Sequence, residues 1–112
     1  MTLFEKIANR EIPASFVHED ADLIAIHDIN PESPYHILII PRKPIASLNA
    51  VKSEDAALVG KMIVLARELA ERLGFAEKGY RLVFNCGTEG GQTVDHLHLH
   101  LLGGRQLHWP PG

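Results

Sequence analysis

The chain of 112 residues has one cysteine, no excess of basic residues and no long apolar run. Because Cys86 has no partner for a disulfide within the chain, a reducing cytoplasmic setting is favoured over a secreted one. The 11 Lys and Arg residues stand against 14 acidic ones, and this net charge of −3 argues against a broad basic surface for nucleic acid. The first residues lack an export signal, and no segment approaches the roughly 18 consecutive apolar residues of a membrane span. We therefore expect a cytoplasmic protein that binds neither nucleic acid nor membranes.

The length of the chain limits how it can be organised. With 112 residues and 46% hydrophobic content, it can form one hydrophobic core but not two. No repeat, low-complexity run or linker divides the sequence, so we expect a single domain over residues 1–112. A domain of this size gains stability from association with a second copy.

Capping residues and apolar spacing predict two helices. Thr2 and Glu5 form a capping-box pattern ahead of a short helix that should end near Pro13. Ser53 is a good N-cap for a long helix, because apolar residues then recur at spacings of three and four. Gly74 is placed to close that helix. We expect the long helix to cover one face of a sheet.

Runs of β-branched and aliphatic residues predict five strands, at residues 16–19, 23–29, 35–40, 80–86 and 94–102. The first two should form a hairpin, and the last two a second hairpin. The third is almost wholly apolar and should lie in the centre of the sheet. Together the elements predict an α+β fold with an antiparallel five-stranded sheet, one long helix and a short N-terminal helix.

His96, His98 and His100 alternate with leucines in the last predicted strand. A strand sends successive side chains to opposite faces, so the three imidazoles should line one face about 6 to 7 Å apart, with the leucines in the core. A helix would scatter both sets around its axis. Such a row indicates either a metal site or a site that handles protons and phosphate near neutral pH.

Other polar residues lie close to this row in the sequence or in the predicted sheet. Asn85 ends the preceding strand and can both donate and accept hydrogen bonds. Residues 90–93, Gly-Gly-Gln-Thr, offer backbone N–H groups that can bind phosphate oxygens without a lysine. His36 adds a fourth imidazole if its strand lies beside the histidine strand.

Clustered imidazoles suit displacement at a phosphorus atom that carries an amine. A neutral imidazole can attack phosphorus while a neighbouring group delivers a proton to the amine, which otherwise leaves poorly. The covalent product is a phosphorus–nitrogen bond much like the one broken, and water can complete the cycle. Neighbouring charges let different imidazoles hold different protonation states at pH 7.

Residues 96–102 fit the His-φ-His-φ-His-φ-φ signature of the histidine triad (HIT) superfamily, where φ is apolar. Further segments resemble its HINT branch, the histidine triad nucleotide-binding proteins. They are residues 27–29, 36–41, Asn85, 90–93 and the ending 103–112, which finishes Trp-Pro-Pro-Gly. The resemblance covers almost the whole chain and implies a HIT-like fold.

For catalysis, the resemblance implies that His98 is the nucleophile that becomes nucleotidylated. His96 and His100 would flank it, orienting its ring and contacting phosphate, while His36 supports the cluster. Thr93 would contribute a hydroxyl at the phosphate. It stands where many relatives have serine, and it keeps the hydroxyl but is stiffer at χ1.

For binding, the resemblance implies a set of nucleotide contacts. The implied residues are His27, Asp28, Ile29, Asn85, Gly91, Gln92, Thr93, His98 and His100. Asp28 would accept the ribose hydroxyls and Ile29 would pack against the purine. The resemblance also implies a two-fold homodimer whose sheet continues across the interface, with the Trp109 tail near the partner's site.

These expectations combine into a purine nucleoside phosphoramidase that hydrolyses AMP-amine conjugates without a metal or other cofactor. Two alternatives stay open: a nucleotide-binding adaptor whose hydrolysis is incidental, and a zinc protein, since zinc readily accepts three histidines. A dinucleoside polyphosphate hydrolase is a third, but the Trp-Pro-Pro-Gly ending favours the HINT branch.

Overall fold

The computed structural model describes residues 1–112 as the predicted α+β fold around a five-stranded antiparallel sheet. In chain order the strands are β1 (Phe16–Glu19), β2 (Leu23–His27), β3 (Tyr35–Pro41), β4 (Tyr80–Phe84) and β5 (Leu99–Gly103). The helices are α1 (Leu3–Ala8), α2 (Ala56–Arg72) and α3 (Gly87–Gly90), with two 3₁₀ turns, η1 (Leu48–Ala50) and η2 (Ser53–Asp55). The order across the sheet is β1-β2-β3-β5-β4, so β3 is central as predicted. No helix combines the length and the apolar character needed to span a membrane.

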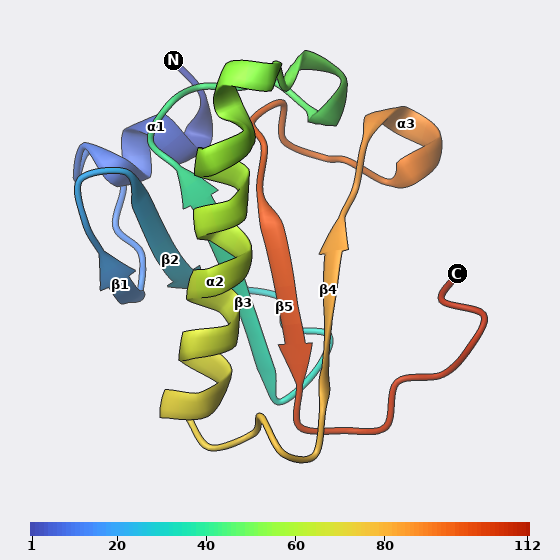
Figure 1. The fold of residues 1–112 in the computed structure, drawn as a ribbon. Coiled ribbons are helices and arrows are strands. Elements are labelled where there is room, and N and C mark those ends of the chain that lie inside the picture. Colours follow the sequence, from blue (N-terminus) through green and yellow to red (C-terminus); the bar gives the residue numbers. More distant parts are fainter.

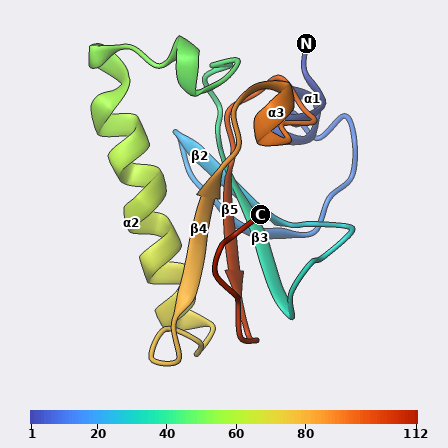
Figure 2. The ribbon, with the colours of Figure 1, turned by 90° about the vertical axis from the view of Figure 1, so that its right-hand side faces the viewer.

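The sheet has helices on both sides (Figure 1, Figure 2). The long helix α2 covers one face, where its buried residues share a core cluster with Leu97, Leu99 and Leu101. On the other side, α1 contributes Phe4 and Ile7 to a second cluster with residues of β2 and β3. The leucines of the histidine segment therefore point into the core beneath α2, as predicted.

His36 and His100 lie on the sheet face turned away from α2. Side chains alternate along β3, so His36 shares its face with Leu38, a member of the α1 cluster. Leu38 is the register partner of His100 in β5, and directly opposed residues share a face. The fold thus separates the imidazole side of the sheet from the main core.

The long helix starts later than predicted, because Asp55 rather than Ser53 organises its beginning. The carboxylate of Asp55 is buried and accepts hydrogen bonds from the Lys52 N–H at 2.9 Å and from Lys43 Nζ at 2.6 Å. The predicted cap falls in η2, and α2 starts after it. The end of α2 matches the prediction, since Gly74 follows it with a φ of 86°.

The short helix α1 carries the predicted capping box. Thr2 Oγ1 accepts from the Glu5 N–H at 3.1 Å, and Glu5 Oε1 accepts from the Thr2 N–H at 2.9 Å. The helix ends at Ala8, earlier than the predicted end near Pro13. Arg10 has a φ of 64°, a left-handed conformation that cannot continue a helix.

The strand prediction for residues 94–102 is wrong in its first half. β5 begins only at Leu99, and the preceding residues follow an irregular path. The register pairs Leu99 with Ile39 of β3. Continued by two residues, it would set Leu97 opposite Pro41, which has no N–H to donate to the ladder. Regular pairing therefore stops at β5, and the segment before it is free to bend.

Two other strand ends also fall short of their predictions. β2 ends at His27 rather than at residue 29, and β4 ends at Phe84 rather than at residue 86. β4 and β5 are antiparallel neighbours as expected, but residues 85–98 join them as a long connection containing α3, instead of the predicted turn of residues 87–93. Most of the residues implied at the phosphate lie in this connection.

Gly103 in β5 is a position where a methyl group does not fit. A Cβ there would lie 2.5 Å from Cδ2 and 2.7 Å from Cε2 of the buried Phe75 ring. We predict that Gly103→Ala lowers the free energy of unfolding in urea by about 1–3 kcal/mol. As a control, Gly60→Ala in α2 meets no atom within 4 Å and should raise it by about 0.5–1 kcal/mol. Wild-type stability in Gly103→Ala would contradict this packing.

Candidate active site

Four imidazoles gather on the side of the sheet opposite α2. The ring of His98 lies 5.1 Å from that of His100, and His100 lies 5.2 Å from His36, measured between ring centroids. His36 joins the row because β3 is the neighbour of β5. On the side of His98, the ring of Phe4 lies 5.0 Å from the His98 ring and 5.8 Å from the His96 ring. The rings are therefore close enough to act together although only one of the triad lies in a strand.

The hydrogen of His98 is placed by a backbone carbonyl. Its Nδ1 lies 2.7 Å from the carbonyl oxygen of His96. A carbonyl oxygen can only accept, so Nδ1 carries the hydrogen and the Nε2 of the neutral ring holds a free lone pair. No hydrogen bond within the chain uses that Nε2. His98 is thus held in the tautomer that a nucleophile requires.

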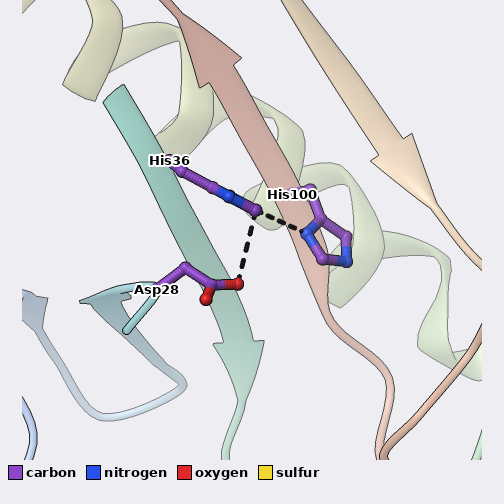
Figure 3. Close-up of side chains that lie close together, drawn as sticks. All are labelled: Asp28, His36 and His100. Carbon is purple, nitrogen blue, oxygen red and sulfur yellow. Dashed lines mark hydrogen bonds and ion pairs between the residues drawn. The ribbon is translucent and has the colours of Figure 1, made fainter. Parts of the chain in front are cut away.

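The hydrogens of His36 and His100 are placed by a backbone amide. The Glu32 N–H donates to His36 Nδ1 at 3.0 Å, so the hydrogen of His36 must sit on Nε2. That Nε2 lies 2.9 Å from His100 Nδ1 and 3.4 Å from Asp28 Oδ2, and Figure 3 shows both contacts meeting on the His36 ring. Because His100 Nδ1 accepts, the hydrogen of His100 sits on its Nε2.

The Nε2–H of His100 has no acceptor in the chain. It is the one buried side-chain polar atom without a hydrogen-bond partner. Leaving a buried donor unpaired costs about 1–3 kcal/mol, so such a group calls for an explanation. An anionic oxygen placed beside His98 and His100 would supply the missing acceptor.

Burial keeps these rings neutral near pH 7. It lowers the pKa of His36 despite nearby carboxylates, and it lowers the pKa of His96. Burial, with His98 and His36 as neighbours, lowers the pKa of His100 to about 4. Each of the three therefore carries one hydrogen at neutral pH, as the hydrogen-bond assignments require.

His96 has no nitrogen left for a phosphate. Its Nε2 donates to the Pro41 carbonyl at 2.7 Å, which leaves Nδ1 to accept from the Thr2 hydroxyl at 2.7 Å. The residue is only 1% exposed. The expected phosphate contact of His96 is therefore not available in this structure. Its side chain is instead anchored at both nitrogens, and the carbonyl of its backbone accepts from His98 Nδ1.

Asp28 makes one contact within its own turn and another with His36. Its Oδ1 accepts from the Asn30 N–H at 2.8 Å, the turn-capping pattern of an aspartate before Asn-Pro, while Oδ2 faces His36. The adjacent His27 and Ile29 are exposed, Ile29 by 90%. The three residues implied at the nucleoside thus follow one another at the end of β2, next to His36.

The residues implied at the phosphate differ in how they are held and in how exposed they are. The Gln92 side chain is fully hydrogen-bonded: Oε1 accepts from the Gly87 N–H at 3.0 Å, and Nε2 donates to the Val94 carbonyl and, outside the loop, to the Ala46 carbonyl. Gly91 and Thr93 are exposed. Gln92 therefore braces the loop that presents its two neighbours.

Asn85 and Trp109 are the remaining implied residues. Asn85 is half-buried directly after β4. Trp109 lies 81% exposed on the C-terminal tail, which is tied to β4 by a hydrogen bond from Arg81 to the His108 carbonyl at 3.0 Å. Neither side chain makes a hydrogen bond to an imidazole within the chain.

Asp28, His36 and His100 also place three possible metal-ligating atoms within 4.8 Å of one another. To bind a metal there, His36 would need a bare Nε2 and therefore a hydrogen on Nδ1. That hydrogen would point at the Glu32 N–H. Metal-bound histidines normally donate their second nitrogen to an acceptor. The polarity of this cluster therefore suits a proton relay better than a metal site.

Comparison with known proteins gives matches over nearly the whole chain. The HIT domain family matches residues 9–107. A HIT-like protein of Synechocystis is 52% identical over 111 residues, covering 99% of this chain and 96% of that protein. The crystal structure of a HIT family hydrolase from Legionella pneumophila has a TM-score of 0.98 at 53% identity, with 100% of both chains covered. That of a histidine triad nucleotide-binding protein from Candida albicans has a TM-score of 0.82 at 28% identity, covering 98% of this chain and 83% of that one.

The lowered histidine pKa values predict an acid-sensitive fold. As pH falls below 6.5 the unfolded chain binds protons that folded His36, His96 and His100 refuse, so stability should fall as pH is lowered, and for His100 this loss continues down to about pH 4. Urea unfolding at several pH values should give a shallower pH dependence for His100→Asn than for the wild type. His108→Asn, on the exposed tail, is the control and should keep the wild-type slope. Parallel curves for His100→Asn and wild type would contradict the assignment.

Proposed function

The chain belongs to the HIT domain family, and from this we propose that it is a nucleotide hydrolase of the HINT branch. The proposed activity is that of a purine nucleoside phosphoramidase, which cleaves the phosphorus–nitrogen bond between AMP and an amine. A relative described as a hydrolase and another described as nucleotide-binding support this class. The observation that carries the proposal is the bare Nε2 of His98 beside a ring whose Nε2–H has no partner.

His98 is the proposed nucleophile. Its Nε2 lone pair attacks phosphorus, a new phosphorus–nitrogen bond forms, and the bond to the amine breaks. The ring then carries positive charge, which the His96 carbonyl stabilises through the Nδ1–H. Water next attacks the adenylyl-histidine: a phosphorus–oxygen bond forms, the bond to Nε2 breaks and returns its lone pair, and the proton of the water passes to the neighbouring imidazole that protonated the amine.

His100 is the proposed proton donor to the departing amine. A phosphate anion bound beside it raises its pKa from the low value of the free site, so the ring can take up a proton and pass it to the leaving nitrogen. His36 lies behind it at 2.9 Å, with Asp28 next in line. No metal or other cofactor is needed for either step.

The nucleoside is proposed to lie along the end of β2. Asp28 accepts hydrogen bonds from the ribose hydroxyls, and the exposed Ile29 packs against the purine with His27 beside it. Ile29 is 90% exposed and follows Asp28, so its side chain can gain apolar contact when a base binds.

The phosphate is proposed to lie between the histidines and the connection that precedes β5. The backbone at Gly91, the hydroxyl of Thr93 and the amide of Asn85 bind its oxygens, and Gln92 keeps their loop in place. These donors also stabilise charge that builds up on the phosphoryl oxygens during attack.

Brief mixing with an adenosine phosphoramidate, followed by an alkaline quench, should trap the intermediate. Intact mass analysis should find one added AMP, and peptide mapping should place it on His98. We predict that His98→Asn abolishes the adduct and lowers turnover by roughly 10⁴-fold or more, because the nucleophile is lost. His108→Asn, on the exposed tail, should form the adduct normally.

Other outcomes of the same experiment would point to the alternatives. Full turnover in His98→Asn would contradict the mechanism. A wild-type protein that binds AMP but forms no adduct and no product would be a nucleotide-binding adaptor. Turnover that requires stoichiometric zinc and is lost on chelation would indicate a zinc protein.

The proposed assembly is a two-fold homodimer, as the HINT resemblance implies. β4 is an edge strand whose outer side has no partner within the chain, and all five of its residues are half-buried. Ile63 and Val64 of α2 are 46% and 47% exposed. Pairing of β4 with its copy would continue the sheet, remove an open edge and cover apolar surface, and it would bring the Trp109 tail toward the partner's site.

Light scattering should give twice the mass of a single chain. We predict that Ile63→Lys shifts the protein toward monomer, because a charge would replace apolar surface at the interface. Leu3→Lys is a matched control, since Leu3 is 45% exposed on α1, and it should remain dimeric. A monomeric wild type at micromolar concentration would contradict the assembly.

A further inference from the structure

The N-terminal helix is connected to His98 through His96. The Thr2 hydroxyl contacts His96 Nδ1 at 2.7 Å, and the carbonyl of His96 accepts from His98 Nδ1 at 2.7 Å. His96 is anchored on its far side by the Pro41 carbonyl at 2.7 Å. Thr2, at the start of α1, thus contacts the residue whose carbonyl fixes the position of the hydrogen on His98.

The Thr2 hydroxyl has two roles of opposite polarity. Its oxygen accepts from the Glu5 N–H at 3.1 Å, which caps α1. Its hydrogen goes to His96 Nδ1, because the carbonyl on Nε2 forces that nitrogen to hold the ring's hydrogen. Helix capping alone needs only an acceptor. The donor half of Thr2 is directed to a histidine that is 1% exposed.

The same helix also contacts the ring of His98. Phe4 is 4% exposed, and its ring meets His98 edge to face at 5.0 Å and an interplanar angle of 72°. It meets His96 at 5.8 Å and 78°. The start of the chain, Thr2 with α1, therefore contacts both His96, whose carbonyl orients His98, and the His98 ring itself.

We propose that Thr2 is a positioning residue for the nucleophile. Its hydroxyl fixes the ring of His96, the ring holds the backbone of His96 in place, and the carbonyl of that backbone keeps His98 in the Nδ1–H form. The role of His98 as nucleophile rests on the proposed function, whereas the effect on its tautomer does not.

The charged and titratable groups that face His96 are Glu5 and His98. Burial lowers the pKa of His96 more than Glu5 raises it, so its Nδ1 is a bare acceptor near pH 7. Serine at position 2 could still donate to it, valine could not, and aspartate could cap the helix but only accept. Variants with these three residues at position 2 therefore distinguish helix capping from hydrogen-bond donation to His96.

The test compares Thr2→Val with Thr2→Ser, and uses Glu5→Ala as the matched control. Glu5→Ala removes the other half of the capping box without changing the donor to His96. In single-turnover experiments, Thr2→Val should slow formation of adenylyl-His98 by about 10-fold to 100-fold with little change in KM, because the nucleophile is misplaced. Thr2→Ser should restore the rate to within about twofold, and Glu5→Ala should keep it. Equal slowing in Thr2→Val and Glu5→Ala would overturn the proposal, as would a wild-type rate in Thr2→Val.

Nitrogen-15 NMR of the histidine rings gives a readout that needs no substrate. Wild-type His98 should be in the Nδ1–H form, and Thr2→Val should give a mixture of its two tautomers. Thr2→Asp keeps the cap, and its acceptor should hold His96 protonated to a higher pH than in wild type. Unchanged His96 and His98 spectra in both variants would overturn the proposal. If the tautomer shifts but the wild type forms no adduct, the proposed function fails and the positioning effect stands.

Discussion

The hydrogen bond between His98 Nδ1 and the His96 carbonyl, at 2.7 Å, decides which nitrogen of His98 is free. A main-chain carbonyl cannot change from acceptor to donor, so this polarity is fixed in a way that a hydroxyl or an amide side chain could not guarantee. The Glu32 N–H donates to His36 Nδ1, so the hydrogen of His36 lies on its Nε2. Because that hydrogen points to His100 Nδ1, the hydrogen of His100 lies on its own Nε2. One ring consequently presents a lone pair and its neighbour presents a hydrogen.

This arrangement depends on a strand, β5, that begins late. In a continuous ladder the carbonyl of His96 would be committed to a neighbouring strand. β5 begins only at Leu99, so His96 lies outside the ladder. The carbonyl of His96 is therefore available to the side chain two residues later. Because the segment before β5 is irregular, the carbonyl of His96 can orient the ring of His98.

The sequence predicted those features that depend on neighbours in the chain. Runs of β-branched and aliphatic residues located all five strands, the nearly continuous apolar run at residues 35–40 indicated the central one, and the Thr2 and Glu5 pattern located α1. Local pattern could not show that Pro41 shortens β5, because that depends on another strand. Nor could it pair Thr2 with His96, which lie 94 positions apart. Proton placement on the four rings was also beyond it, because it depends on which groups the fold brings to each nitrogen: backbone groups for His36, His96 and His98, and the ring of His36 for His100.

The exposure of the tail has a practical consequence for optical measurements on this protein. Trp109 is the single tryptophan of the chain and lies 81% exposed. Indole emission follows the polarity of its immediate surroundings, so the intrinsic fluorescence of an isolated chain already resembles that of an unfolded one. A thermal melt followed by emission wavelength would then miss the loss of the core, whereas far-ultraviolet circular dichroism would detect it. A blue-shifted emission would instead report that something covers the tail.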